Sequence, residues 1–200
     1  MDESSEKVVL REGDIQRALT RISHEIVERN PQERVLAVVG IHRRGAFLAQ
    51  RLRDSLEALL DAEIPLGDLD IGFYRDDVAS RPEAPVLHAS HIDFDVTGRT
   101  VVIVDDVLFT GRTVRAAIEA LFDYGRPERV QLAVLADRGH RELPIRPDYV
   151  GKNLPTARDE RVNVRVEELD GVDEVTIATS GPGDEAPGPR FAPDVPKELA

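Results

Sequence analysis

The segment VVIVDDVLFTGRT, residues 101 to 113, constrains the fold of this chain more than any other part of its 200 residues. Its β-branched residues predict a buried strand, and this strand runs directly into two adjacent carboxylates, Asp105 and Asp106. A Thr-Gly-Arg-Thr turn follows, and residues 112 to 124 then carry an apolar stripe at helical spacing. A strand, a polar turn and a helix in this order predict one βα unit of a parallel sheet.

The rest of the chain repeats this alternation. Residues 14–30 predict an amphipathic helix with Asp14 as its N-cap, and the strand expected at 34–40 leads through a basic turn into a helix at 46–60. Further strands are expected around 64–74, at 129–137, within 161–169 and at 174–179. We therefore predict an α/β fold with a mainly parallel, twisted sheet flanked by helices on both faces.

Two stretches interrupt the pattern. Residues 75–91 are polar, contain two prolines and lack periodicity, which favours a flexible lid or binding loop. Residues 179–200 are rich in Pro and Gly and predict a disordered tail. The remaining length suits a single domain over residues 1–178.

Composition excludes some functions. The chain has no cysteine, which rules out disulfides, thiolate metal sites and a cysteine nucleophile. No apolar run approaches the ~20 residues of a membrane span, and the N-terminus lacks the basic segment followed by an apolar segment that is typical of a signal peptide. We therefore expect a cytoplasmic protein with no membrane partner. The net charge of -12 argues weakly against nucleic acid as the default partner.

The paired carboxylates and the turn after them predict a ligand site. Ligands of open α/β sheets bind beyond the carboxyl ends of the strands, and a helix start favours phosphate through its unpaired N–H groups. Asp105 and Asp106 could accept hydrogen bonds from a ribose diol, while Thr110, Gly111, Arg112 and Thr113 hold its 5′-phosphate. The alternative is that the two aspartates are only a polar strand end that caps a turn.

The segment VVIVDDVLFTGRT resembles the phosphoribosyl pyrophosphate (PRPP) signature of type I phosphoribosyltransferases. Together with ALTRISHEIVERN, VGIHRRG, DIGFYRDD and GRPERVQLAVLADRGHRELPIRPDYVGKN, it is similar to the PyrR family, whose members are uracil phosphoribosyltransferases and attenuation regulators of pyrimidine operons. The similarity covers most of residues 8 to 178. It implies a type I phosphoribosyltransferase fold with a small hood, mainly from residues 137–178, and a lid at about 75–91. It also implies an enzyme that converts uracil and PRPP into UMP and pyrophosphate.

The resemblance assigns roles around this signature. GIHRRG (40–45) becomes the pyrophosphate loop, which would contribute His42, Arg43 and Arg44, and Arg75 would lie at the hinge of the lid. Asp105, Asp106 and Arg44 are the expected catalytic residues. Phe109 stands where purine enzymes carry an acidic residue, so the expected uracil pocket is formed by Phe109, Asp137 and Arg138. Mg²⁺ is expected to arrive with PRPP and lie near the two aspartates, without a dedicated protein metal site.

The family's second activity is binding of a stem-loop in pyrimidine operon mRNA, promoted by UMP and related uridine nucleotides. The corresponding positions are all polar or basic here: Thr20, Arg21, His24, Arg29, His140, Arg141, Arg146 and Lys152. The alternative is an ordinary charged surface on an exposed helix. Three functions stay open: enzyme and RNA regulator, uracil phosphoribosyltransferase alone, or a nucleotide-sensing RNA binder without catalysis. The family also implies a homodimer or homotetramer.

Overall fold

The computed structural model describes residues 6–31, 35–72, 74 and 90–179. Its main sheet has five strands in the order β3-β2-β4-β5-β6, and all neighbours run parallel. These strands are β2 (Leu36–Ile41), β3 (Leu66–Leu69), β4 (Thr100–Leu108), β5 (Arg129–Asp137) and β6 (Tyr149–Asn153). No helix among the described residues is long and apolar enough to cross a membrane.

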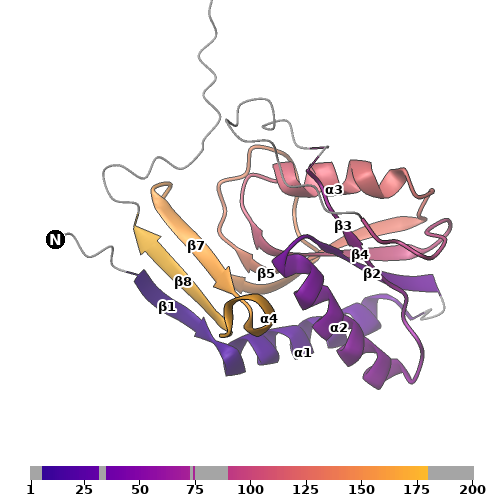
Figure 1. Ribbon diagram of the computed structural model, residues 1–200, viewed down its shortest axis with the longest axis horizontal. Helices are drawn as coiled ribbons and strands as arrows, with labels where there is room; N and C mark the ends of the chain where they lie inside the picture. The colour runs from indigo at the N-terminus through magenta and orange to yellow at the C-terminus, as the bar shows by residue number, and fades with distance from the viewer. Residues whose placement is uncertain (1–5, 32–34, 73, 75–89, 180–200) are drawn as a thin grey trace, which may run out of the picture.

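Helices cover both faces of this sheet, as the sequence predicts (Figure 1). Helices α1 (Glu12–Arg29) and α2 (Arg44–Leu60) pack on one face and α3 (Arg112–Phe122) on the other. The alternation of side chains along β4 explains why both faces are apolar. Val102 and Val104 point to α1 and α2, whereas Val101 and Ile103 point to α3, and all four are buried.

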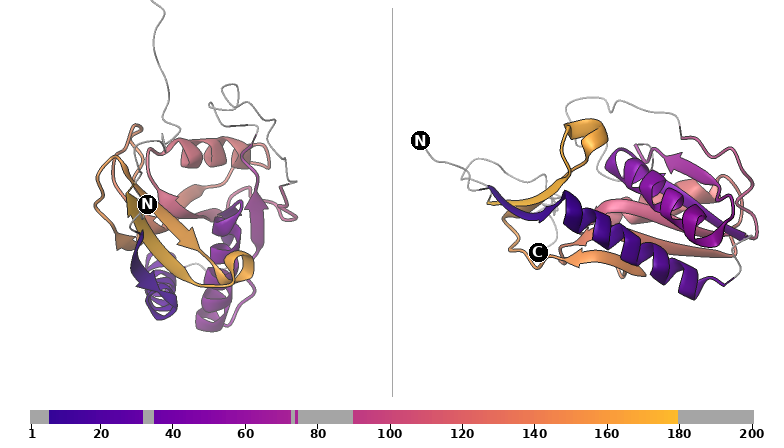
Figure 2. Two further views of the ribbon diagram at one scale, coloured as in Figure 1. Left: turned by 60° about the vertical axis from the view of Figure 1, so that its left-hand side comes forward. Right: turned by 90° about the horizontal axis from the view of Figure 1, so that it is seen from below.

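A second, antiparallel sheet with the order β1-β8-β7 forms the hood (Figure 2). Strands β7 (Glu160–Arg165) and β8 (Glu174–Thr179) flank the short helix α4 (Glu167–Asp170) and come from the expected segment. The third strand, β1 (Glu6–Arg11), comes from the other end of the chain and leads straight into α1. The N-terminal segment therefore ties the hood to the helical layer.

Several predicted boundaries were wrong. Helix α1 begins earlier than expected, with Arg11 as its N-cap, and Asp14 accepts a hydrogen bond from the Arg11 backbone N–H at 3.0 Å. Strand β3 ends at Leu69 rather than continuing to residue 74. Residues 167–170, expected to continue a strand, form α4 instead. Arg75 and most of the expected lid, as well as residues 180–200, lie outside the described residues.

Candidate active site

The two aspartates lie near the carboxyl end of the central strand β4, a few residues before α3 begins. The Asp105 side chain is buried, at 6% exposure, and its Oδ1 accepts the Asp106 backbone N–H at 2.9 Å. Asp106 Oδ1 in turn accepts the Val107 backbone N–H at 2.7 Å. These bonds fix both carboxylates at the carboxyl end of the strand, where a ligand of a parallel sheet binds.

Burial raises the pKa of Asp106, although part of its side chain reaches solvent. The hydrogen bond from the Val107 backbone N–H, a side-chain hydrogen bond with Asp105 and the positive charge of Arg44 oppose this rise. The site therefore holds a carboxylate at an electrostatic cost that hydroxyl donors or a cation could relieve.

The turn after β4 has the expected form of a helix start. Gly111 is the N-cap residue of α3 at φ 95°, a left-handed conformation that favours glycine. The Arg112 backbone N–H lies 3.4 Å from Thr110 Oγ1, and Thr113 lies half-buried in the first turn. The Arg112 side chain donates from Nε to Glu142 Oε2 at 2.7 Å, in the loop between β5 and β6.

The loop at residues 40–45, predicted to bind pyrophosphate, packs tightly against Asp105. A Cβ on Gly45 would lie 2.6 Å from the Val104 carbonyl oxygen and 3.2 Å from Asp105 Cα, so only glycine permits this approach. The loop contains a cis peptide bond between His42 and Arg43. Arg43 is exposed, whereas His42 Nε2 lies 2.5 Å from Asp68 Oδ1.

Arg44 directly precedes Gly45, which packs on Asp105, and its positive charge lowers the pKa of Asp106. Its guanidinium pairs with Asp170 of the hood, with Nε 3.1 Å from Oδ2 and Nη2 2.8 Å from Oδ1. The predicted catalytic residues Asp105, Asp106 and Arg44 therefore belong to one site.

The residues predicted to bind uracil also gather, beyond the ends of β4 and β5. Arg138 Cζ lies 4.1 Å from the centre of the Phe109 ring, and burial lowers the pKa of Arg138. Asp137 Oδ2 accepts Arg141 Nη2 at 2.5 Å, and Arg141 Nη1 donates to the Phe109 carbonyl oxygen at 2.8 Å. Phe109 and His140 meet edge to face at 6.0 Å. An aromatic ring and planar cations of this kind could stack on a pyrimidine.

The positions predicted to bind RNA fall into three places. His140 and Arg141 contact Phe109 and Asp137, two of the residues predicted to bind uracil. On α1, Thr20, Arg21, His24 and Arg29 are exposed, and Lys152 is exposed on the neighbouring strand β6. Arg21 Nη2 donates to the carbonyl oxygens of Val150 and Gly151, at 2.8 and 2.7 Å, and thereby fastens α1 to this strand.

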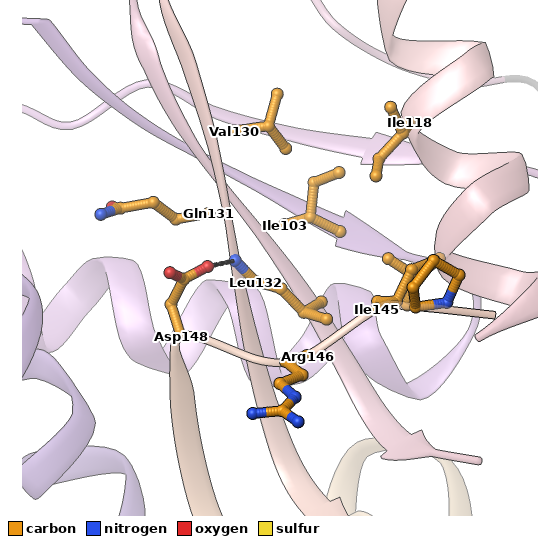
Figure 3. A pocket seen from close by; sticks show the side chains of 10 residues that line it. Ile103, Ile118, Val130, Gln131, Leu132, Ile145, Arg146 and Asp148 are labelled. Atoms are coloured by element: carbon orange, nitrogen blue, oxygen red, sulfur yellow. Dashed lines mark hydrogen bonds between the residues drawn. The ribbon is translucent and has the colours of Figure 1, made fainter. Parts of the chain in front are cut away.

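The third place is a cavity of about 230 Å³ under α3, which Arg146 helps to line (Figure 3). It is lined mainly by aliphatic side chains, including Ile103, Ile118 and Leu132, with Arg146 and Asp148 at its rim. In Figure 3, Arg146 points away from these aliphatic side chains, and Asp148 Oδ2 accepts the Leu132 backbone N–H at 2.8 Å.

The sequence did not reveal the carboxylates that pair with the cations of the site. Asp68, Glu142 and Asp170 lie 26, 30 and 126 positions away from His42, Arg112 and Arg44 respectively. An isolated acidic residue in a chain with 38 of them gives no local signal of such a role.

Among the described residues, no group of three or more His, Cys, Asp or Glu side chains could hold a metal ion alone. The donors that do converge are the oxygens of Asp105 and Asp106, which suit a hard cation that a ligand also coordinates. The residues present therefore fit a Mg²⁺ ion shared with a phosphorylated ligand.

A family model and the similar curated proteins agree on the family of this chain. The family described as "Phosphoribosyl transferase domain" matches residues 7–170. The chain is 61% identical over 181 residues to "Bifunctional protein PyrR" of Roseiflexus sp. (strain RS-1), covering 88% of this chain and 99% of that protein. It is 56% identical over 173 residues to "Bifunctional protein PyrR" of Brevibacillus brevis, covering 86% and 97%.

Solved structures share the fold at low sequence identity. A hypoxanthine phosphoribosyltransferase from Staphylococcus aureus matches with a TM-score of 0.65 and 23% identity, covering 91% of this chain and 98% of that one. The enzyme from Trypanosoma cruzi matches with a TM-score of 0.67 and 17% identity, covering 90% and 100%. This likeness confirms the expected fold and, at these identities, the fold alone.

Proposed function

Because the chain belongs to the PyrR family of phosphoribosyltransferases, we propose that the site at the carboxyl ends of β2, β4 and β5 transfers the phosphoribosyl group of PRPP to uracil. As a member of this family, the protein is a uracil phosphoribosyltransferase that also regulates pyrimidine operon expression. We assign these two activities to two groups of side chains.

One observation carries the catalytic assignment: the pyrophosphate loop and the paired aspartates are in direct backbone contact. Gly45 packs on Val104 and Asp105, and the start of α3 lies a few residues further along the same strand–turn–helix unit. A molecule with a 5′-phosphate, a ribose diol and a 1′-diphosphate presents these groups in the order in which α3, the aspartates and the loop could bind them. PRPP has this chemistry.

Each side chain then has a defined task. The turn from Thr110 to Thr113 holds the 5′-phosphate with its N–H and hydroxyl donors. Asp105 and Asp106 accept hydrogen bonds from the ribose hydroxyls and hold the sugar while its anomeric C–O bond breaks. Arg44 binds the departing pyrophosphate. Asp105 and Asp106 would also hold a Mg²⁺ ion that arrives with PRPP, partly through water, and such an ion supplies positive charge to the diphosphate.

Uracil is the proposed acceptor because Phe109, just beyond β4, stands at the position where purine enzymes carry an acidic residue. Uracil N1 bonds to the anomeric carbon as pyrophosphate leaves, and the N1 proton is released. The guanidinium of Arg138 packs against the Phe109 ring and is positioned to interact with a flat, carbonyl-rich base. Asp137 would line the same pocket. A glycosyl transfer of this type, at the anomeric carbon, needs no covalent nucleophile.

An assay of base specificity tests this assignment. With Mg²⁺ and PRPP, uracil should be converted to UMP with release of pyrophosphate, and kcat/KM for hypoxanthine or guanine should be at least ~100-fold lower because a pocket built around one set of polar groups leaves them unpaired with another base. Chromatography of the nucleotide product measures both. A faster reaction with a purine base would show that the pocket is assigned wrongly.

For the regulatory activity, we propose that α1 and β6 present the RNA-binding surface, formed by Thr20, Arg21, His24, Arg29 and Lys152. The observation that favours it is that Arg21 fastens the helix to the strand, which brings two sequence-distant groups of polar side chains together. His140, Arg141 and Arg146 would extend this surface towards the base pocket. The RNA would be the leader of a pyrimidine operon mRNA, bound in the presence of UMP or other uridine nucleotides.

Assembly and location are also proposals. A homodimer or homotetramer would place several copies of α1 side by side and enlarge the cationic area that one acidic chain offers. The proposed partners, PRPP and nascent mRNA, favour the cytoplasm. Light scattering coupled to size-exclusion chromatography measures the number of chains in the assembly. A protein that stays monomeric and still binds the leader RNA tightly would contradict the proposed assembly.

A further inference from the structure

Helix α4 of the hood lies against the N-terminal half of α2, where the pyrophosphate loop ends (Figures 1 and 2). Two arginines of α2 pair with acidic residues from α4 and the turn after it. Arg44 pairs with Asp170, and Arg51, seven positions further on, pairs with Glu168 and Asp173. These contacts join segments more than 110 positions apart in the sequence, as the separations of 126, 117 and 122 show.

The two arginines differ in how firmly they are held. Arg51 makes four hydrogen bonds of 2.6 to 2.9 Å to two carboxylates, and its pair with Asp173 is well shielded, with side-chain exposures of 19% and 10%. The Arg44–Asp170 pair is more open, at 35% and 21%. Arg51 therefore anchors α4, and the contact of Arg44 with Asp170 can break without releasing the helix.

Arg44 faces two possible partners. Its Nε and Nη2 atoms bond both oxygens of Asp170, which occupies the edge of the guanidinium that binds a phosphate in bidentate fashion. Asp170 itself is held in place, because its Oδ2 also accepts the Val166 backbone N–H at 2.9 Å. Hydrogen bonds from Arg44 lower the pKa of Asp170, so this carboxylate stays charged at neutral pH. A diphosphate must therefore share Arg44 with a fixed negative charge.

We propose that Asp170 competes with pyrophosphate for Arg44 and thereby weakens the binding of the diphosphate to the site. This inference rests on the proposed function, because it takes Arg44 to be the diphosphate-binding cation. When the diphosphate binds, Arg44 leaves Asp170, and α4 stays anchored through Arg51. When pyrophosphate has been cut from PRPP, Asp170 takes Arg44 back and favours release of the product.

The substitution Asp170→Asn tests this competition. It removes the charge, keeps the size of the side chain and retains an oxygen for the Val166 N–H. Isothermal titration with pyrophosphate and Mg²⁺ should show tighter binding by roughly two- to five-fold, the range expected from loss of one partly exposed ion pair. Glu167→Gln is the matched control, because it removes one negative charge from the same exposed helix and should leave the affinity within experimental error.

The opposite result has a clear meaning. If Asp170 only orients Arg44, then Asp170→Asn weakens pyrophosphate binding, and the proposal is overturned. An equal gain in Glu167→Gln would also overturn it, because the effect would be one of general charge. Combining Asp170→Asn with Arg44→Ala isolates the contact: the gain should disappear when Arg44 is absent.

A measurement on the unaltered protein covers the case in which Asp170→Asn folds poorly. Hydrogen exchange should show faster exchange of the Val166 backbone amide on addition of pyrophosphate and Mg²⁺, because its acceptor, the Asp170 carboxylate, loses the contact with Arg44 while α4 stays anchored through Arg51. Unchanged or slower exchange would contradict the competition. Failure of the unaltered protein to bind pyrophosphate, or full binding by Arg44→Ala, would instead contradict the proposed function of the loop.

Discussion

Burial raises the pKa of Asp106 above its ordinary value of 3.8, and the nearby charge of Arg44 lowers it only in part. The folded protein therefore takes up a proton at Asp106 more readily than the unfolded chain does. Stability must fall as pH rises from the ordinary pKa to the raised one, and the loss persists at higher pH. The buried carboxylate that we propose binds ribose hydroxyls thus lowers the stability of the free protein at neutral pH.

The substitution Asp106→Asn should separate this cost from the function. The amide stays neutral, so the variant should be more stable than the unaltered protein at pH 7, with a difference that shrinks as the pH falls towards ~4. A gain of about 1 kcal/mol would raise Tm by roughly 2–4 °C. The KM for PRPP should rise by at least about ten-fold, because a charged acceptor is lost.

Thermal unfolding over a pH series and steady-state kinetics measure the two effects of Asp106→Asn. Asp61→Asn is the control, because Asp61 is exposed at the far end of α2 in a left-handed conformation that Asn tolerates. Its kinetics should not change. Unaltered PRPP kinetics in Asp106→Asn would return the paired aspartates to the role of a polar strand end.

At the scale of elements, α1 is held on β6 by arginines that were also predicted to bind RNA. Arg21 bonds two carbonyl oxygens of β6, and Arg29 Nη1 donates to the Asp148 carbonyl oxygen at 2.9 Å. His24 and Lys152 are exposed beside them. Arg21 therefore has a structural role whether or not it contacts RNA, whereas His24 and Lys152 offer a cleaner test of binding.

We expect His24→Ala and Lys152→Ala to weaken binding of the operon leader stem-loop while leaving Tm and UMP synthesis nearly unchanged. Each lost phosphate contact should flatten the log–log dependence of affinity on salt by about 0.7 to 0.9. Arg21→Ala should lower both RNA affinity and Tm, because it also removes the bonds to β6. Filter binding at several salt concentrations measures the affinities.

Arg126→Ala serves as the control for these variants. Arg126 is exposed in the turn before β5, at the amino-terminal ends of the strands, whereas the proposed ligand site lies at their carboxyl ends. Loss of its side chain should leave RNA binding intact. If the Arg126 variant lost as much affinity as the His24 and Lys152 variants, binding would depend on overall charge and not on the surface of α1 and β6.

The elements that sequence predicted best are those whose signals are local. Strand β5 and strand β8 have the expected bounds, and the strand–turn–helix unit around Asp105 carries its hydrophobic pattern, its turn glycine and its carboxylates between Thr100 and Phe122. Strand β1 was missed because its residues are mostly exposed and its partner β8 lies at the other end of the domain. The sequence did not predict the pairing of Arg44 with Asp170 either, because these residues lie 126 positions apart.

At the scale of the whole molecule, β5 links the two proposed activities. Asp137 and Arg138 lie at its carboxyl end, beside the base pocket. Nearer its start, Gln131 Oε1 accepts Asn30 Nδ2 at 3.0 Å, and Asn30 is the C-cap of α1. The same amide nitrogen lies 3.1 Å from the Tyr149 hydroxyl of β6. One strand and one buried polar cluster therefore connect the base pocket with the helix that we propose binds RNA.

This connection predicts that UMP and RNA strengthen each other's binding. If UMP favours one arrangement of α1 on β5 and β6, it should tighten the stem-loop by a factor in the range of about 5 to 150, and RNA must then tighten UMP by the same factor. Because the proposed surface binds RNA phosphates through cationic side chains, RNA affinity should fall with salt, so both factors belong at one ionic strength. Titration of UMP with and without RNA, and of RNA with and without UMP, measures both factors.

The variant Asn30→Ala should reduce the shared factor, while RNA binding without UMP should change less, because Asn30 is buried and lies in neither proposed binding site. Equal UMP affinity with and without RNA would show that the two sites are energetically independent.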